Sequence, residues 1–113
     1  MKIIRDTITL NEIKTMASAT FGNMLKAVVD VNRDVIAIDA ELHSDLEAFL
    51  LEDGSMQKGL WGINIYPDMQ GKDFIEFDSM INMRPSQGNK TRGVKNEELR
   101  RKIVDIVTKR ITQ

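Results

Sequence analysis

Two runs of strand-forming residues lie next to each other in the first third of the chain, separated by only three polar residues. The runs cover residues 24–31 and 35–39, and Asn32-Arg33-Asp34 joins them. Because so short a connection can join only antiparallel strands, the runs predict a β-hairpin. Alternation places Leu25, Ala27, Val29 and Val31 of the first run, and Ile36 and Ile38 of the second, on the face that is expected to lie on the core. The fold of this chain must therefore contain an antiparallel pair.

The rest of the chain predicts strands and helices that flank this hairpin. Strands are expected over residues 2–8, 61–66 and 74–83. Helices are expected from a capping box at Thr9 and Glu12 to Gly22, over 41–52, and from an Asn96 cap onward. The order strand–helix–strand–strand–helix–strand–strand–helix predicts a single α+β domain over residues 1–113. We expect a mostly antiparallel sheet of about five strands with the helices packed on one face.

Helices on the apolar face would leave the opposite face of the sheet polar and largely acidic. Alternation places these residues on that face: Lys26, Asp30, Asp39, Asn64, Tyr66, Glu76, Asp78 and Asn82. A solvated face is ordinary for an antiparallel sheet. The alternative is a face on which a protein partner or a second copy of the chain docks.

Charge is divided unevenly along the chain, although the net charge is only −1. Residues 1–83 hold 7 Lys and Arg against 14 Asp and Glu, which gives −7. Residues 84–113 hold 9 Lys and Arg against 3 Asp and Glu, which gives +6. Such asymmetry can indicate an anion-binding end. The alternative is an acidic sheet face that simply complements a basic helix.

Composition also indicates a compartment. Cysteine is absent, which is typical of a reducing environment. No apolar run approaches the roughly 20 residues of a membrane-spanning helix, and the amino terminus has no signal-peptide pattern. We expect a cytoplasmic protein without a membrane partner.

A polar loop before the last helix is the main candidate for a binding site. It contains two glycines and runs into the amino end of a helix, where anions are favoured. The predicted ligand-binding residues are Arg84, Ser86, Gln87, Asn89, Lys90, Thr91 and Arg92. The loop lacks the Lys-Ser/Thr pair of a Walker loop. It predicts a binding module for a phosphate-bearing ligand, either a nucleotide or a nucleic-acid backbone; alternatively, its side chains are only solvated.

Two carboxylates and the only histidine are the candidate catalytic residues. Glu76 and Asp78 share one face of a predicted strand next to the cationic loop, and carboxylates in such a place can act as bases or hold Mg²⁺. His43 can act as an acid or a base. The alternative function is therefore a metal-assisted phosphodiesterase or related hydrolase. One histidine and no cysteine predict no transition-metal site, and the sequence identifies no cofactor.

Two further function classes stay open. The last helix carries five cations that, with the loop, suit a nucleic-acid backbone: Arg100, Arg101, Lys102, Lys109 and Arg110. Aromatic residues are only 5%, and none lies in the basic part, so base stacking is poorly provided for. The acidic sheet face or an exposed edge strand instead suits a protein partner or a homo-oligomer.

Three segments resemble an uncharacterised family of small prokaryotic proteins, a domain of unknown function. The segments are LEDGS at 51–55, LWGINIYP at 60–67 and FDSMINMRPSQGNKTRGV at 77–94. The resemblance covers almost the whole chain, and its last segment is the most specific. It implies a compact stand-alone domain and suggests a bacterial or archaeal cytoplasm. It implies no activity, cofactor or catalytic residue.

Overall fold

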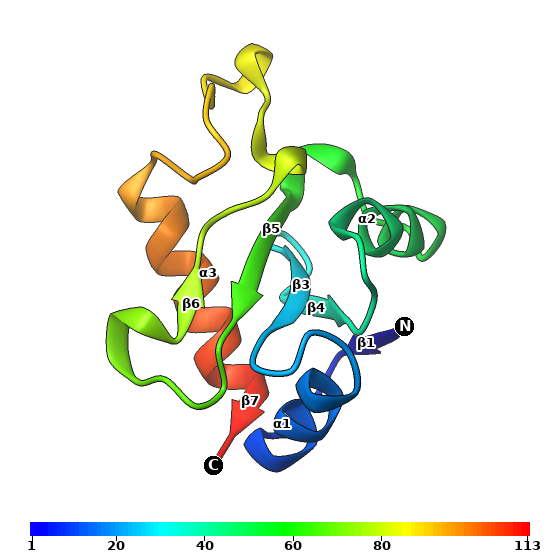
Figure 1. Ribbon diagram of the computed structural model, residues 1–113. Helices are drawn as coiled ribbons and strands as arrows, with labels where there is room; N and C mark the ends of the chain where they lie inside the picture. Colours follow the sequence, from blue (N-terminus) through cyan, green and yellow to red (C-terminus); the bar gives the residue numbers. More distant parts are fainter.

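The computed structural model describes residues 1–113 and contains three α-helices and two sheets (Figure 1). The helices are α1 (Leu10–Ala19), α2 (His43–Glu52) and α3 (Glu97–Arg110). The strands are β1 (Lys2–Ile4), β2 (Ile8–Thr9), β3 (Leu25–Asp30), β4 (Val35–Ile38), β5 (Leu60–Ile65), β6 (Ile75–Glu76) and β7 (Ile111–Thr112). The larger sheet has the order β1-β4-β3-β5-β6 and is antiparallel throughout, whereas β2 and β7 form a short parallel pair. The predicted α+β class and five-stranded antiparallel sheet are confirmed.

The predicted hairpin lies at the centre of the larger sheet. β3 and β4 pair with Ala27 opposite Ile38, and Asp34 in the turn adopts a left-handed conformation with φ of 56°. The other edge of β3 pairs with β5, from Leu25 opposite Ile65 onward. The hairpin therefore supplies the two strands on which the rest of the sheet is assembled.

The sheet is covered on both faces rather than on one. On the first face, α1 and α3 enclose a core of apolar residues through side chains such as Ile13 and Ile103. On the second face, Leu46 and Leu50 of α2 pack on Val28 and on residues of β4. Figure 1 shows α2 on the opposite side of the sheet from α3. The second face carries a valine and alanine patch among its polar residues, and burial of this patch under α2 removes apolar surface from water.

Side-chain caps fix the start of two helices where the sequence predicted them. Thr9 Oγ1 accepts from the backbone N–H of Glu12 at 3.2 Å, and the Glu12 side chain completes the capping box by accepting from the backbone N–H of Thr9. Asn96 Oδ1 accepts from the N–H of Leu99 at 2.9 Å. The predicted strand over 2–8 is instead divided into β1 and β2, because the second piece leaves the sheet and pairs with β7 beyond the end of α3.

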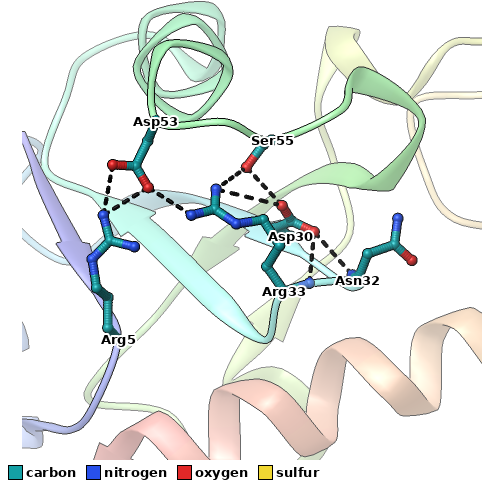
Figure 2. Close-up of polar contacts among 6 residues, drawn as sticks. All are labelled: Arg5, Asp30, Asn32, Arg33, Asp53 and Ser55. Atoms are coloured by element: carbon teal, nitrogen blue, oxygen red, sulfur yellow. Dashed lines mark hydrogen bonds and ion pairs between the residues drawn. The ribbon is translucent and has the colours of Figure 1, made fainter.

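A polar cluster shapes the turn between β3 and β4 (Figure 2). The buried Asp30 carboxylate accepts from the backbone N–H groups of Asn32 and Arg33 at 2.9 and 3.0 Å. Its second oxygen accepts from the Ser55 hydroxyl at 2.6 Å. Asp30, predicted to lie on an open polar face, is therefore a structural residue of the hairpin turn.

The same cluster ties the turn to the end of α2. The Arg33 guanidinium donates to Ser55 Oγ at 2.6 Å and to Asp53 at 2.7 Å. Arg5 also donates to both oxygens of Asp53 at 2.6 Å, as Figure 2 shows. Hydrogen bonds from Arg5 and Arg33 lower the pKa of the Asp53 carboxyl. All four carboxylate oxygens of the cluster have donors, so we assign it a structural role.

The long strand predicted over 74–83 does not form. Only Ile75 and Glu76 pair with β5, and the chain then turns into a 3-10 helix over Met80–Asn82. The Asn82 side chain takes the place of a pairing strand: its Oδ1 accepts from the N–H of Gly62 at 2.8 Å, and its Nδ2 donates to the Gly62 carbonyl at 2.9 Å. A side-chain amide can supply the hydrogen bonds that a neighbouring strand would otherwise make to the backbone. The alternation of residues over 74–83 therefore predicted a strand that does not form.

Gly62 allows this close crossing because it has no side chain. A Cβ at position 62 would lie 2.5 Å from the Cβ of Ser79, which is attached directly to the backbone. We expect Gly62→Ala to lower the free energy of unfolding by about 1–3 kcal/mol, since the segment must shift to accommodate the methyl group. Chemical denaturation measures this change. Gly93→Ala is the matched control, because a Cβ there meets its nearest atom at 3.4 Å. Equal losses of stability in the two variants would contradict the close approach of Ser79 to Gly62.

Candidate functional site

The polar loop is closed into a small hairpin at its base. The N–H of Arg84 donates to the Asn89 carbonyl at 2.7 Å, and the N–H of Asn89 donates back at 3.1 Å. A 3-10 turn over Pro85–Gln87 connects them, and Gly88 follows with φ of +80°. This left-handed conformation favours glycine and reverses the chain. The loop tip is therefore a defined turn that projects beyond the sheet, as Figure 1 shows.

Arg84 points into the fold and not toward a ligand at the surface. Its Nε and Nη1 atoms donate to the carbonyls of Ile81 and Gln57 at 2.9 and 2.8 Å. Its Nη2 donates to the carbonyl of Leu60. Only 8% of the residue is exposed. These bonds fasten the loop to the start of β5.

Two further groups enclose the Arg84 guanidinium. It lies 4.5 Å from the centre of the Trp61 ring, and its Nη2 is 3.7 Å from Glu47 Oε2. That oxygen is buried and has no hydrogen bond. Burial lowers the pKa of Arg84, and Glu47 opposes this shift. Because an arginine stays charged, its guanidinium is a buried charge, and the partly exposed Glu47 lies beside it as the opposite charge.

Asn89 is a second internal support of the loop. Its Nδ2 donates to the carbonyls of Asn82 and Gly93, each at 2.7 Å, and its Oδ1 accepts from the N–H of Lys95 at 3.1 Å. One side chain thus fixes both ends of the loop and the residues that lead into α3.

Beside the loop tip lies the lysine cavity, which we define as the cavity between the tip and the start of α3. It has a volume of about 630 Å³. Its lining includes Lys58, Lys95 and Lys102, together with Gln87 and Asn89 from the predicted site. None of the three lysines belongs to any of the ion pairs in the structure. The cavity therefore collects cationic groups without carboxylate partners.

The remaining predicted loop residues lie elsewhere. Ser86, Lys90 and Thr91 are exposed and line neither this cavity nor the cavity that contains Glu76 and Asp78. Arg92 points toward the segment that follows β6, where its Nε lies 2.7 Å from Asp78 Oδ1. The structure therefore separates the seven predicted ligand-binding residues into internal supports, cavity-lining residues and exposed residues.

The three candidate catalytic residues lie at one cavity. Glu76, Asp78 and His43 all line a cavity of about 580 Å³, which we call the second cavity. Arg92 lines it as well, whereas Arg84 does not. The second cavity lies over β3 and β5, between the start of α2 and the segment that follows β6. The fold thus brings His43 next to residues more than 30 positions away along the chain.

Hydrogen bonds hold the two carboxylates of the second cavity. Glu76 Oε1 accepts from Asn64 Nδ2 at 2.8 Å and from the Tyr66 hydroxyl at 3.2 Å. Burial, together with the charge of Glu76, raises the pKa of Tyr66, so the phenol stays a hydrogen-bond donor. Asp78 is paired with Arg92. No three His, Asp or Glu side chains lie close enough together to hold a metal ion.

His43 has a defined tautomer. Its Nε2 lies 2.8 Å from the carbonyl oxygen of Ile63, and since a carbonyl can only accept, Nε2 carries the hydrogen. Nδ1 is then an acceptor, and no group of the protein donates to it. Burial lowers the pKa of His43, and nearby Lys26 and Arg92 add to this shift, whereas Ile63 and Asp78 oppose it. The imidazole is therefore neutral at pH 7.

The stability of the fold should depend on the protonation of His43. The unfolded histidine takes up a proton near the ordinary pKa of 6.5, whereas the folded one resists it. The contribution to stability is thus full above pH 6.5 and is lost as the pH falls below that value. We expect His43→Gln to flatten the dependence of the unfolding temperature on pH between about pH 5 and 6.5. Thermal unfolding of both proteins across this range checks the expectation; equal slopes would count against it.

One family model matches this chain over almost its whole length. Residues 2–110 match the model of a family described as a protein of unknown function, DUF5674. The chain belongs to the DUF5674 family. No curated protein and no solved structure matched it. The resemblance seen in the sequence is confirmed as membership of a family of unknown function. Separately, none of the helices in this protein is both long and apolar enough to cross a membrane.

Several cavity residues of the DUF5674 chain were not predicted as site residues. Lys58 reaches the lysine cavity from a 3-10 turn before β5, far from the loop in sequence. Lys26, Asn64 and Tyr66 line the second cavity together with Glu76. The sequence contained a signal for these three, since strand alternation placed them on the same face as Glu76. It contained no signal for Lys58.

Proposed function

We propose that this protein binds a phosphate-bearing ligand in the lysine cavity. The observation that carries the proposal is the meeting of Lys58, Lys95 and Lys102 at one cavity without carboxylate partners. Ammonium groups of lysines that line one cavity repel each other when they come close, and an anion between them removes that repulsion. Phosphate, with several charged oxygens, can accept from all three.

Neutral groups support the same ligand. Asn32 and Asn96 line the cavity, and the Nδ2 groups of both make no hydrogen bond within the protein. Glu98 is the only acid in the lining, so the four charged side chains carry a net charge of +2. The cavity therefore favours an anion even with one carboxylate at its edge.

The walls favour recognition of phosphate over recognition of a base. Trp61 is the only aromatic residue in the lining, and it is 4% exposed with the Arg84 guanidinium over its ring. Base recognition in nucleic-acid proteins uses free aromatic faces, and this cavity has none. We therefore expect the phosphate chain of a nucleotide or polyphosphate to dominate binding, with little discrimination between bases.

A titration of backbone amide signals with inorganic pyrophosphate tests the proposal. We expect saturable shifts for residues 87–89 and 95–102, with affinity that falls as salt is added. Lys95→Gln combined with Lys102→Gln should weaken binding at least about tenfold, which is about 1.4 kcal/mol. Lys109→Gln is the control, because Lys109 lies on the same helix outside the cavity. Equal weakening by the control would show only a general charge effect.

The alternative function, a metal-assisted hydrolase, has weaker support. Glu76, Asp78 and His43 do share the second cavity. However, Glu76 accepts from two neutral donors and Asp78 is paired with Arg92. These bonds occupy one oxygen of each carboxylate, and no third carboxylate or histidine lies close enough to complete a metal site with them. We therefore place the phosphate-bearing ligand in the lysine cavity and treat the second cavity separately.

A further inference from the structure

The floor of the second cavity is a row of three polar side chains on neighbouring strands. Lys26 of β3 is opposite Asn64 of β5, and Asn64 is opposite Glu76 of β6. Directly opposite residues project from the same face of a sheet, and all three line the cavity. A cation, an amide and a carboxylate thus lie in order across the floor.

The middle of this row lacks a hydrogen-bond donor. Asn64 is 6% exposed, and its Nδ2 donates to Glu76 Oε1 at 2.8 Å. Its Oδ1 is buried and has no partner. Lys26 makes no ion pair and lies with its Nζ 5.3 Å from the centre of the Phe21 ring. A buried acceptor without a donor is unfavourable, so a ligand that supplies an N–H group at this point would be stabilised.

The charges around the row are balanced. Lys26 and Arg92 are the cations of the second cavity, and Glu76 and Asp78 are its anions. The net charge of the lining is therefore zero, unlike that of the lysine cavity. A phosphate ester would meet two carboxylates here, whereas a molecule with one positive and one negative end would meet a partner for each.

Four apolar residues also line the second cavity, and we call them its rim: Met24, Leu42, Met80 and Ile81. Leu42 is 54% exposed and Met80 is 65% exposed, so apolar surface is available next to the polar groups. A ligand that fits both parts has a polar end and an aliphatic end.

We propose that the second cavity binds a free α-amino acid with an aliphatic side chain. The ammonium group donates to Asn64 Oδ1 and to the Glu76 carboxylate. The carboxylate accepts from Lys26 and from the Arg92 guanidinium. The aliphatic side chain lies on the rim, against Leu42 and Met80. This inference does not depend on the proposed function, because no residue lines both cavities.

Leucine and three analogues test the chemistry of this site. The probes are leucine, 3-methylbutylamine without the carboxylate, 4-methylpentanoate without the amine, and N,N,N-trimethyl-leucine without N–H groups. In amide titrations we expect leucine to shift residues 24–26, 64–66 and 76–81. Each analogue should bind at least about tenfold more weakly. Absence of saturable leucine binding would overturn the proposal, as would equal binding of trimethyl-leucine.

Two variants assign the two ends of the ligand. Lys26→Met should weaken leucine binding about tenfold and leave 3-methylbutylamine unchanged, since only the carboxylate loses its partner. Glu76→Gln should weaken both leucine and the amine. Lys72→Met is the control outside the cavity. The variant with Lys95→Gln and Lys102→Gln should bind leucine normally, so failure of one site is distinguishable from failure of the other. Weakening of leucine and the amine to the same degree by Lys26→Met would contradict the assignment.

Discussion

Replacement of Arg84 by alanine is expected to lower the free energy of unfolding by about 3–5 kcal/mol. The substitution leaves the carbonyls of Ile81 and Leu60 without their donor, and the Gln57 carbonyl keeps only the N–H of Leu60. It also leaves the buried Oε2 atom of Glu47 without its counter-charge. Since a domain of this size has a total stability of about 5–15 kcal/mol, the loss is a large fraction of it. Urea denaturation measures the change.

Two further substitutions show whether the cost of Arg84→Ala comes from its buried bonds. Arg84→Lys should be intermediate, because one ammonium group cannot match three separated carbonyls or stack on the Trp61 ring. Arg92→Ala should cost less than about 1 kcal/mol, because Arg92 is 55% exposed and forms only a surface ion pair. If Arg84→Ala cost no more than Arg92→Ala, a ligand-facing role for Arg84 would be the better interpretation.

Replacement of Asn82 by alanine should have the second-largest effect, about 2–4 kcal/mol. Asn82 is fully buried, and its side chain satisfies both the N–H and the carbonyl of Gly62. It also donates to the carbonyl of Arg92 at 2.9 Å. The N–H and the carbonyl of Gly62 would be left without partners, whereas the Arg92 carbonyl would keep the N–H of Ser79 at 3.0 Å. Chemical denaturation measures the stability, and hydrogen exchange at the Gly62 amide reports the local loss of protection.

A conservative change and a surface change separate the causes for Asn82. Asn82→Asp keeps the acceptor for the Gly62 N–H but loses both donated bonds, so it should also be strongly destabilising. Asn23→Ala, at an exposed position, should change stability by less than about 0.5 kcal/mol. Retained protection of the Gly62 amide in Asn82→Ala would contradict the role assigned to this side chain.

Local patterns predicted those parts of the fold that depend on local interactions. The hairpin followed from two apolar runs and a three-residue turn, and the helix starts at Thr9 and Asn96 followed from side-chain caps. Each of these features is decided by residues close together in the sequence. The placement of α2 on the second face was not predicted, because it depends on a patch assembled from two strands.

The segment after β6 could not be predicted because side chains there replace backbone pairing. Residues 74–83 alternate like a strand. However, the Asn82 side chain bonds to the Gly62 backbone, and the absence of a Cβ at Gly62 lets this segment pass close to β5. Arg84 and Asn89 were interpreted as donors to a ligand, whereas in the structure they donate to backbone carbonyls. The sequence could not show this, because every residue has a carbonyl and the pattern does not indicate which one a side chain will reach. Residue type alone cannot distinguish a donor that faces a ligand from one that faces a carbonyl.

Part of the arrangement of the candidate sites was predicted. Glu76 and Asp78 were proposed as catalytic residues, with His43 as a further candidate, and all three line one cavity in the structure. The loop and the start of the last helix were proposed as one binding site, and they do enclose a cavity, with Lys58 added from elsewhere. Whether these cavities bind the proposed ligands stays a prediction.

Calorimetric titration of pyrophosphate at low salt tests the proposed function most directly. The comparison is between the wild type, a variant with Lys58, Lys95 and Lys102 all changed to Gln, and a charge-matched variant with Lys14, Lys90 and Lys109 changed to Gln. The second set lies outside the lysine cavity and removes the same charge. We predict saturable binding to the wild type and to the charge-matched variant, and none to the cavity variant. Similar binding to both variants, or none to the wild type, would contradict the lysine cavity as a phosphate site.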